Sequence, residues 1–393
     1  MDLFAKCSVF SDQLRFAKEA GTYFFFRTIE SSQDTEVTIH GRRIIMASSN
    51  NYLGLSNHPR VKEAAVRAVE RYGTGSSGSR ILNGNLDIHE ELEKKLARFF
   101  RKEDALVFAT GYQTNLGIIS ALLGRHDTAI IDQYDHASII DGCRLSFGNL
   151  KKFRHNDMED LSAILRKENG GGRLIIVDGV FSMEGDLANL PCITRLAGEH
   201  GARVMVDDAH GIGVLGPGGR GTAEHFGVEN EVDLIMGTYS KSLGSIGGFV
   251  AGCKEIIQYI RHHGRSMVFS AGLAPPLVSA VSTALDIIEE ESGLRARLWK
   301  NTRKMLQGFA DMGYDIGASQ TPIIPIIIRD TERVYQMCEL LFLQGIFVSP
   351  VISPAVPPGR ELIRTSYMAT HTEEQLDRVL DAFATAGKQI GII

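Results

Sequence analysis

The sequence predicts an α/β protein whose main part is a mainly parallel sheet flanked by helices, with a smaller α+β domain after it. Between about residues 45 and 275, short apolar segments alternate with amphipathic helices. The apolar segments are continuously hydrophobic, which is typical of strands buried on both faces of a parallel sheet. From about residue 276 this alternation ends and long helical stretches with isolated strands follow. A chain of 393 residues is long enough for two or three domains.

The predicted elements begin with a short N-terminal segment, residues 1–45, that holds a helix and a hairpin. A large domain over residues 46–275 follows, and its first helix begins near Pro59 and ends at Gly73. A second helix has four apolar side chains on one face, namely Ile88, Leu92, Leu96 and Phe99. Six strands are predicted after it: Ala105–Phe108, Thr128–Asp132, Leu174–Asp178, Val204–Asp207, Leu234–Gly237 and Gly248–Ala251.

Each of the first five strands leads directly into polar or glycine-rich residues. In parallel sheets covered by helices, ligands bind just beyond the carboxyl ends of the strands. The functional residues are therefore expected at these five junctions.

The small domain is predicted over residues 276–393. It begins with a long helical stretch from Val278 through Leu294 and onward. Its last helix opens with a capping box formed by Thr372 and Gln375. Between them the sequence predicts three elements: a strand at Pro322–Ile328, a helix at Arg333–Leu343 and a strand at Ile346–Ser349.

Composition excludes several classes of protein. The net charge is only −5 with no run of like charges, which disfavours a nucleic-acid binder. The five cysteines are scattered and form no CxxC pair, so we expect reduced thiols in a cytoplasmic protein, without a disulfide frame or a zinc site. The N-terminal residues do not form a secretory signal, and no apolar run approaches the ~20 residues of a membrane helix.

Lys241 is the first candidate for chemistry. It follows a predicted strand within the small-residue segment Gly237–Ser242. Burial in a closed site would lower the pKa of its amine and make the amine available to form an imine. The hydroxyls of Thr238 and Ser240 could then hold a phosphate group. The alternative is an ordinary surface lysine on a Ser/Gly loop.

Asp207 is the second candidate, at the end of the strand Val204–Asp207. A carboxylate at this place can keep a pyridine nitrogen protonated and so make the ring an electron sink. The alternative interpretations are a carboxylate that caps the following turn and a metal ligand. The sequence shows no second His/carboxylate cluster with ligand spacing, so no metal is expected.

Other candidates lie at the neighbouring junctions and in the small domain. Backbone amides of Gly111 and Tyr112, at a predicted helix start, form a natural phosphate seat. The segment is not a GxxxxGK[ST] loop, which disfavours a nucleoside triphosphate. His136 could stack on a planar cofactor, or simply be hydrogen bonded. Arg364 could bind a substrate carboxylate with both prongs of its guanidinium, or form a surface salt bridge.

With these segments in order, the sequence resembles the α-oxoamine synthase family, within the fold-type I pyridoxal-phosphate (PLP) enzymes. The resemblance covers nearly the whole chain. Five motifs carry it: Ser48–Leu55, Gly73–Arg80, Asp178–Asp186, Asp207–Gly211 and Ser353–Gly359.

The resemblance implies roles for the matching positions. Lys241 would carry PLP as a Schiff base and remove the Cα proton, Asp207 would pair with the pyridinium nitrogen, and His136 would stack over the ring; these three are the implied catalytic residues. The resemblance also implies that His210 contacts the phenolic oxygen and that the phosphate is held by Gly111, Tyr112, Thr238 and Ser240. Ser270 would reach the phosphate of the partner subunit. Arg364 would bind the amino-acid carboxylate, and Asn50 and Ser182 would line the same pocket. Ser240 replaces a glycine found in some relatives, which puts its role in doubt.

The implied reaction is a decarboxylating condensation of an amino acid with an acyl-CoA, at the interface of a homodimer. The flanking segments Tyr72–Gly84 and Ile363–Thr370 favour the members that use serine and palmitoyl-CoA and give 3-oxosphinganine, the first step of sphingolipid synthesis. The main alternative is alanine with pimeloyl-CoA, which gives 8-amino-7-oxononanoate in the biotin pathway. Glycine with acetyl-CoA is less favoured. A non-catalytic subunit is disfavoured because Lys241, Asp207 and His136 are all present.

The N-terminal segment is rich in aromatic residues: Phe4, Phe10, Phe16, Tyr23, Phe24, Phe25 and Phe26. One interpretation is that they pack onto the core. The other is that some of them line an acyl tunnel or touch the inner face of the cell membrane.

Overall fold

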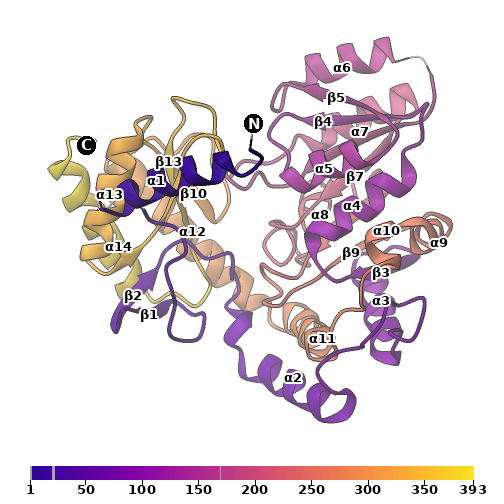
Figure 1. Cartoon of the computed structure of the whole chain (residues 1–393), viewed down its shortest axis with the longest axis horizontal. Helices are drawn as coiled ribbons and strands as arrows, with labels where there is room; N and C mark the ends of the chain where they lie inside the picture. Colours follow the sequence, from indigo (N-terminus) through magenta and orange to yellow (C-terminus); the bar gives the residue numbers. More distant parts are fainter. Residues whose placement is uncertain (1, 20–22, 169) are drawn as a thin grey trace.

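The computed structural model describes residues 2–19, 23–168 and 170–393. Its main feature is a seven-stranded sheet, on the right in Figure 1. The strands in spatial order are β3 (Asp104–Phe108), β9 (Gly248–Gly252), β8 (Leu234–Thr238), β7 (Arg203–Asp207), β6 (Arg173–Asp178), β4 (Thr128–Asp132) and β5 (Asn149–Phe153). Strand β9 runs antiparallel to both of its neighbours, and the other described pairs are parallel. The predicted mainly parallel sheet is confirmed, and all six predicted strands belong to it.

Strand β5 was missed by the sequence analysis. Its sequence, NLKKF, contains two adjacent lysines, and only Phe153 is buried. It pairs with β4 alone, at the edge of the sheet. Edge strands commonly carry lysine because charge discourages pairing with other chains. A search for continuous apolar runs therefore cannot detect this strand.

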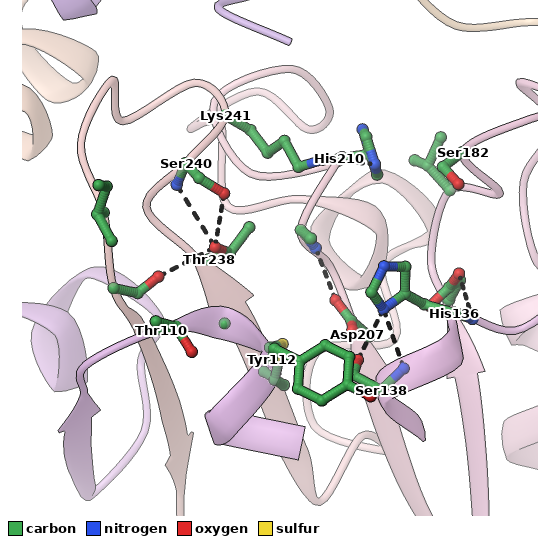
Figure 2. Close-up of a pocket in the computed structure, with 17 residues that line it drawn as sticks. Thr110, Tyr112, His136, Ser138, Ser182, Asp207, His210, Thr238, Ser240 and Lys241 are labelled. Atoms are coloured by element: carbon green, nitrogen blue, oxygen red, sulfur yellow. Dashed lines mark hydrogen bonds between the residues drawn. The ribbon is translucent and has the colours of Figure 1, made fainter. Parts of the chain in front are cut away.

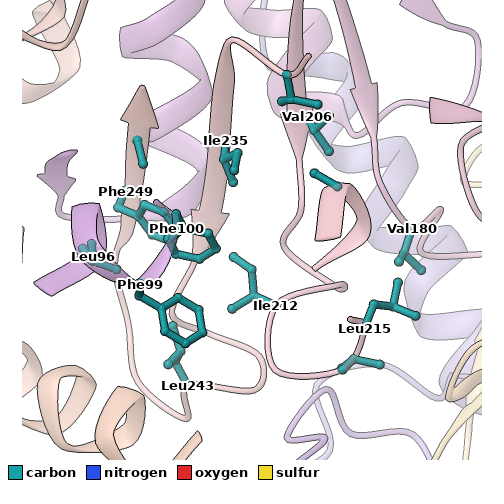
Figure 3. Close-up of a cluster of buried hydrophobic side chains, with 14 of the residues drawn as sticks. Leu96, Phe99, Phe100, Val180, Val206, Ile212, Leu215, Ile235, Leu243 and Phe249 are labelled. Carbon is teal, nitrogen blue, oxygen red and sulfur yellow. The ribbon is translucent and has the colours of Figure 1, made fainter. Parts of the chain in front are cut away.

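Both faces of the sheet are buried, which explains the continuous apolar character of its strands. In β7, for example, Val204 and Val206 belong to one hydrophobic cluster and Met205 belongs to another. Figure 3 shows part of the first cluster, in which Phe249 of β9 stacks on Phe100. Helices flank the sheet: α3 (Asp87–Phe99), α4 (Gly111–Leu122), α5 (Ala137–Leu145), α6 (Met158–Lys167), α7 (Leu190–His200), α8 (Thr222–Phe226), α9 (Lys254–His263) and α10 (Arg265–Val268). Helix α2 (Pro59–Tyr72) lies farther from the sheet and packs mainly against a later helix, α11 (Pro275–Glu290).

The C-terminal part contains two small sheets, on the left in Figure 1. One sheet is antiparallel, in the order β10 (Ile323–Ile327), β13 (Leu362–Ser366) and β12 (Ser349–Val351). The other joins the N-terminal hairpin, β1 (Glu36–Ile39) and β2 (Arg42–Met46), to β11 (Ile346–Phe347), which runs parallel to β2. The helices of this part are α12 (Ser292–Asp311), α13 (Thr331–Leu343) and α14 (Glu373–Gln389), whereas α11 (Pro275–Glu290) lies beside the large sheet. The predicted capping box of α14 is present.

Three details correct the sequence analysis. The predicted strand at Ile346–Ser349 is divided between β11 and β12, which lie in different sheets. The long helical stretch breaks at Glu291, whose backbone leaves the helical region between α11 and α12. Strand β13, which carries Arg364, was not identified. The domain limits at residues 45 and 275 remain predictions, and α11 packs mainly with α2 in the cluster of the large sheet.

The N-terminal helix α1 (Ala5–Glu19) has no buried residue. Of the N-terminal aromatic residues, Phe24 packs into the C-terminal core and stacks on Tyr335, with ring centroids 5.6 Å apart. The aromatic residues of α1, Phe10 and Phe16, are exposed. No helix within residues 2–19, 23–168 and 170–393 is both long and apolar enough to cross a membrane.

Candidate active site

A pocket of about 300 Å³ lies beyond the carboxyl ends of five parallel strands (Figure 2). Every one of the five predicted strand junctions contributes to it. Its wall consists of Thr110, Gly111 and Tyr112 after β3, His136 and Ser138 after β4, Asp178, Val180 and Ser182 from β6, Asp207, Ala209 and His210 from β7, Met236, Thr238, Ser240 and Lys241 from β8, and Ile246 and Gly247 before β9. Nine of the twelve predicted site residues therefore meet in one pocket.

One end of the pocket is built to hold an anion. Helix α4 begins here at Gly111, and its first amides have no partner within the helix. A side chain at position 111 would place its Cβ 2.6 Å from Thr238 Oγ1, so only glycine leaves this space open. The hydroxyls of Thr238 and Ser240 lie 3.0 Å apart beside it. Free amides and two hydroxyls together suit a phosphate group.

Asp207 forms the floor of the pocket and is buried. Asn115 donates to its Oδ2 over 2.7 Å, and the amide of Ala209 donates to its Oδ1 over 3.1 Å. Burial, followed by the charges of Asp207 and Asp135, raises the pKa of Asp178 well above its ordinary value. Asp178 and Asp207 are partners in neighbouring strands, so their carboxylates oppose each other's charge in this buried place.

Lys241 reaches the pocket from the loop after β8 (Figure 2). Its Nζ lies 3.3 Å from His210 Nε2. Burial and the nearby charge of Arg364 lower the pKa of Lys241 to about 8, against the opposing effect of Asp207 and Asp178. An amine with a pKa of about 8 is roughly one tenth neutral and nucleophilic at pH 7, far more than an ordinary lysine. The alternative of an ordinary surface lysine is wrong.

His136 caps the N-terminus of α5 and presents its ring to the pocket (Figure 2). Its backbone amide donates to Asp178 Oδ2 over 3.1 Å, and its Nδ1 lies 2.7 Å from Ser138 Oγ. Tyr112 faces it edge-on, with ring centroids 6.4 Å apart. The imidazole is fixed by these contacts, and its open face can stack on a planar ligand.

Arg364 enters from β13 of the C-terminal part and is buried. Its Nε donates to the carbonyl oxygen of Ser182 over 2.7 Å, and one terminal nitrogen donates to Asn50 Oδ1 over 2.8 Å. The alternative of a surface salt bridge is wrong, and within the described part of the chain no carboxylate pairs with Arg364. Asn50 and Arg364 are not part of the pocket wall itself but adjoin it through Ser182.

Ser270 is the predicted site residue that lies apart from the pocket. Its hydroxyl accepts a hydrogen bond from Nε2 of Gln113, a residue of α4, over 3.0 Å. Three further residues, Asn115, Ser138 and Asp178, support or line the pocket and were not predicted as site residues. Asn115 lies four residues after Gly111, a spacing that returns a helix to the same face. Ser138 and Asp178 lie at predicted junctions, but serine and aspartate are too common there to stand out.

The residues present fit pyridoxal phosphate. The anion seat at α4, the buried carboxylate of Asp207 and the amine of Lys241 match the phosphate, the ring nitrogen and the aldehyde of that group. His136 can cover one ring face. The fit depends on the shape of the pocket, because only glycine at position 111 leaves the phosphate end open.

Comparisons with known proteins agree with this geometry. The family model for aminotransferase class I and II matches residues 42–383. The chain is 51% identical to a serine palmitoyltransferase of Sphingobacterium spiritivorum, over 95% of this chain and 94% of that protein. It is 44% identical to an 8-amino-7-oxononanoate synthase of Thermoanaerobacter pseudethanolicus, over 97% of each chain.

Comparison with solved structures supports the same family. A solved serine palmitoyltransferase with a PLP internal aldimine superposes with a TM-score of 0.97, at 36% identity and over 100% of both chains. This agreement extends over the large sheet and the C-terminal part. The chain therefore has the fold of the fold-type I PLP enzymes and belongs to the aminotransferase class I and II family and, within it, to the α-oxoamine synthases.

Proposed function

We propose that this chain condenses L-serine with palmitoyl-CoA, in a PLP-dependent reaction that gives 3-oxosphinganine, CoA and CO2. This is the first step of sphingolipid synthesis. The observation that carries the proposal is the convergence of Lys241, Asp207 and Arg364 around one pocket. Serine is preferred to alanine because the identity is 51% to a serine palmitoyltransferase and 44% to an 8-amino-7-oxononanoate synthase.

The cofactor would be held at four points. Lys241 would bind it covalently through the amine, Asp207 would pair with the ring nitrogen, and His210 would contact the phenolic oxygen. The phosphate would be bound by Gly111, Tyr112, Thr238 and Ser240, while His136 and Ser182 would line the two sides of the ring. When bound, the cofactor supplies an electron sink for negative charge that develops at the substrate Cα.

The protein's residues perform the remaining work. Arg364 would bind the serine carboxylate with its guanidinium, supported by Asn50, and so fix the orientation of Cα. Lys241, with a pKa of about 8, would remove the Cα proton and return a proton there after CO2 has left. Asp207 would hold the proton on the ring nitrogen throughout. His136 would shield one face of the site from water.

A substrate panel tests this proposal. Glycine, alanine and serine are each combined with acetyl-, pimeloyl- and palmitoyl-CoA, and CoA release is followed. We expect the highest kcat/KM for serine with palmitoyl-CoA. The highest value for alanine with pimeloyl-CoA would replace the serine assignment with the biotin-pathway reaction.

A homodimer is the assembly that we infer for the active protein. The segments around Ser79 and Ala271 form an isolated bridge, which brings Leu82 and Phe269 into one region. Both side chains are large, apolar and exposed, at 79% and 76%. Ser270 lies beside Phe269, so a partner subunit docked here could receive its hydroxyl at the phosphate end of the site.

Peripheral contact with the inner face of the cell membrane, by an otherwise cytoplasmic protein, is a further part of the proposal. Helix α1 leaves Phe10 and Phe16 exposed, and Phe4 precedes it with 68% exposure. Such side chains can insert at a lipid surface or guide an acyl chain. Deletion of residues 1–20 should reduce recovery with membranes or change acyl-chain preference. Unchanged values for both would remove this role.

A further inference from the structure

We propose that Tyr52 is a positioning residue that sets the tautomer of His210 and so presents His210 Nε2–H to the cofactor's phenolic oxygen. The inference rests on the proposed PLP-dependent function. Tyr52 belongs to the motif Ser48–Leu55, and nothing in the reaction described above uses its hydroxyl.

Tyr52 lies in a row of polar groups that leads from the Lys241 amine to Arg364. Its Oη is 2.6 Å from His210 Nδ1 and 3.3 Å from Asn50 Oδ1. On the far side of the imidazole, His210 Nε2 lies 3.3 Å from Lys241 Nζ, and Figure 2 shows these two side chains next to each other. Tyr52 thus contacts the ring nitrogen that faces away from the pocket.

The position of Tyr52 is fixed by its surroundings. The side chain is 1% exposed and belongs to the main hydrophobic cluster. Its carbonyl oxygen accepts a hydrogen bond from the amide of Ala369 over 2.7 Å, which ties it to the C-terminal part. These contacts hold the Tyr52 oxygen beside His210, while the hydroxyl proton can point to either neighbour.

Both partners are neutral, so each contributes one proton. Burial raises the pKa of Tyr52 to about 12. Burial, followed by the charges of Lys241 and Arg364, lowers the pKa of His210 well below its ordinary value. A neutral imidazole carries a proton on one nitrogen only, and the hydrogen bond at the other nitrogen decides which.

Two arrangements of these protons are possible. In the first, Tyr52 donates to His210 Nδ1, and the imidazole proton is on Nε2. In the second, Tyr52 donates to Asn50 Oδ1, His210 Nδ1–H donates to Tyr52, and Nε2 accepts from the Lys241 ammonium. Each arrangement has one proton on the phenol and one on the imidazole.

The state of Lys241 selects between them. A free Lys241 ammonium requires an acceptor, which favours the second arrangement. When Lys241 is bonded to the cofactor, that ammonium is gone and a phenolic oxygen needs a donor. The first arrangement supplies Nε2–H, and Asn50 Oδ1 stays satisfied because Arg364 donates to it over 2.8 Å. In the holoenzyme, donation from Tyr52 to His210 Nδ1 therefore holds the imidazole proton on Nε2, which is the tautomer that the phenolic oxygen requires.

The test uses Tyr52→Phe, which removes the hydroxyl and keeps the buried ring. The visible absorption of the bound cofactor is titrated with pH in the holoenzyme. A donor stabilises the negative phenolic oxygen that remains when the nitrogen joined to the cofactor loses its proton. Tyr52→Phe weakens the His210 Nε2–H donor, so the negative phenolic oxygen is less stabilised. We therefore expect the pH midpoint of the absorption change to rise by about one unit. An unchanged midpoint would overturn the proposal.

Tyr314→Phe is the matched control. Tyr314 is also buried, and its hydroxyl donates to the carbonyl oxygen of Phe383 over 2.7 Å within the C-terminal core. Both variants lose one buried hydroxyl and its hydrogen bond, so both should lose similar stability. Only Tyr52→Phe should move the midpoint, and an equal shift in both variants would contradict a specific role.

A second measurement is made on the wild-type protein and does not depend on the folding of Tyr52→Phe. Nitrogen-15 NMR of wild-type holoenzyme, with the His210 signal assigned by its loss in His210→Gln, should show the proton on Nε2. A proton on Nδ1 would overturn the proposal. Neither measurement needs an amino acid or an acyl-CoA, so an error in the substrate assignment would leave both intact. A wild-type protein without a visible cofactor band would instead contradict the proposed function.

Discussion

At the scale of the residue, the environment of each side chain decides its chemistry. Lys241 lies on a Ser/Gly loop that exposes many lysines in other proteins, but burial and Arg364 lower its pKa to about 8. Arg364 is held by a backbone carbonyl and an amide oxygen, so its charge stays available for a ligand. Sequence pattern identified both residues, whereas their burial depends on contacts between segments more than 100 residues apart, which no local pattern contains.

Lys241→Ala should keep the cofactor and lose the reaction. The phosphate seat at Gly111 and Thr238 is unaffected, so PLP should still bind, without a covalent link. Because the base at Cα is removed, CoA release should fall by about 10³-fold or more. Absorption spectra and a CoA assay measure the two effects. Wild-type turnover in this variant would assign the base to another residue.

Arg364→Lys should weaken serine binding and leave cofactor binding unchanged. Lysine keeps the positive charge but lacks the planar pair of donors that matches a carboxylate. The apparent Kd for serine, followed by the change in cofactor absorption, should rise by about tenfold or more, a loss of roughly 1.4 kcal/mol. An unchanged Kd would place the carboxylate elsewhere.

At the scale of the element, His155 connects three of the loops that follow the sheet strands. It stands after β5, its Nδ1 is 3.1 Å from Asp132 Oδ1 at the end of β4, and its Nε2 is 2.9 Å from Asp186 Oδ2 after β6. Tyr134 stacks on its ring at 4.6 Å. The loop from β6 also carries Ser182, so this cluster helps to fix the pocket. The sequence analysis missed it because β5 itself was missed.

His155→Gln should remove a pH-dependent part of the stability. Burial opposes the charged imidazole, but the hydrogen bonds and charges of Asp132 and Asp186 prevail and raise the pKa of His155 to about 10. The ordinary value in an unfolded chain is about 6.5. The stabilisation is thus complete below about pH 6.5 and is lost as the pH rises through about 10.

Urea unfolding at several pH values measures this effect. Wild type should be more stable than His155→Gln at pH 6, and the difference should narrow steadily toward pH 10. A difference that stays constant over this range would show that the imidazolium charge is not what stabilises the cluster.

At the scale of the whole molecule, the site joins the large sheet to the C-terminal part. Lys241, Asp207 and His136 come from the sheet, whereas Arg364 comes from β13 and Asn50 from the segment after the hairpin. The sequence predicted the sheet well because buried parallel strands are uniformly apolar. It predicted the C-terminal part less well, since β11 and β12 are too short to show a period and belong to different sheets.

The inferred homodimer predicts that Leu82→Asp and Phe269→Asp will favour the monomer. A charge placed in a buried apolar interface is costly, so sedimentation should show a large loss of dimer, together with lower activity. Leu343→Asp at the end of α13 is the control, since this side chain is 59% exposed and belongs to the C-terminal part. If Leu82→Asp and Phe269→Asp dimerise as strongly as wild type, the interface must lie on another face.

A decarboxylating condensation at Lys241 is tested most directly by measuring CO2 and CoA in the same reaction. The holoenzyme is given serine labelled with carbon-14 in its carboxyl group together with palmitoyl-CoA, and labelled CO2 and free CoA are counted. A decarboxylating condensation at the Lys241 site predicts equal amounts of the two, and neither above background in Lys241→Ala. CoA released without labelled CO2 would show thioester hydrolysis instead and would contradict the account.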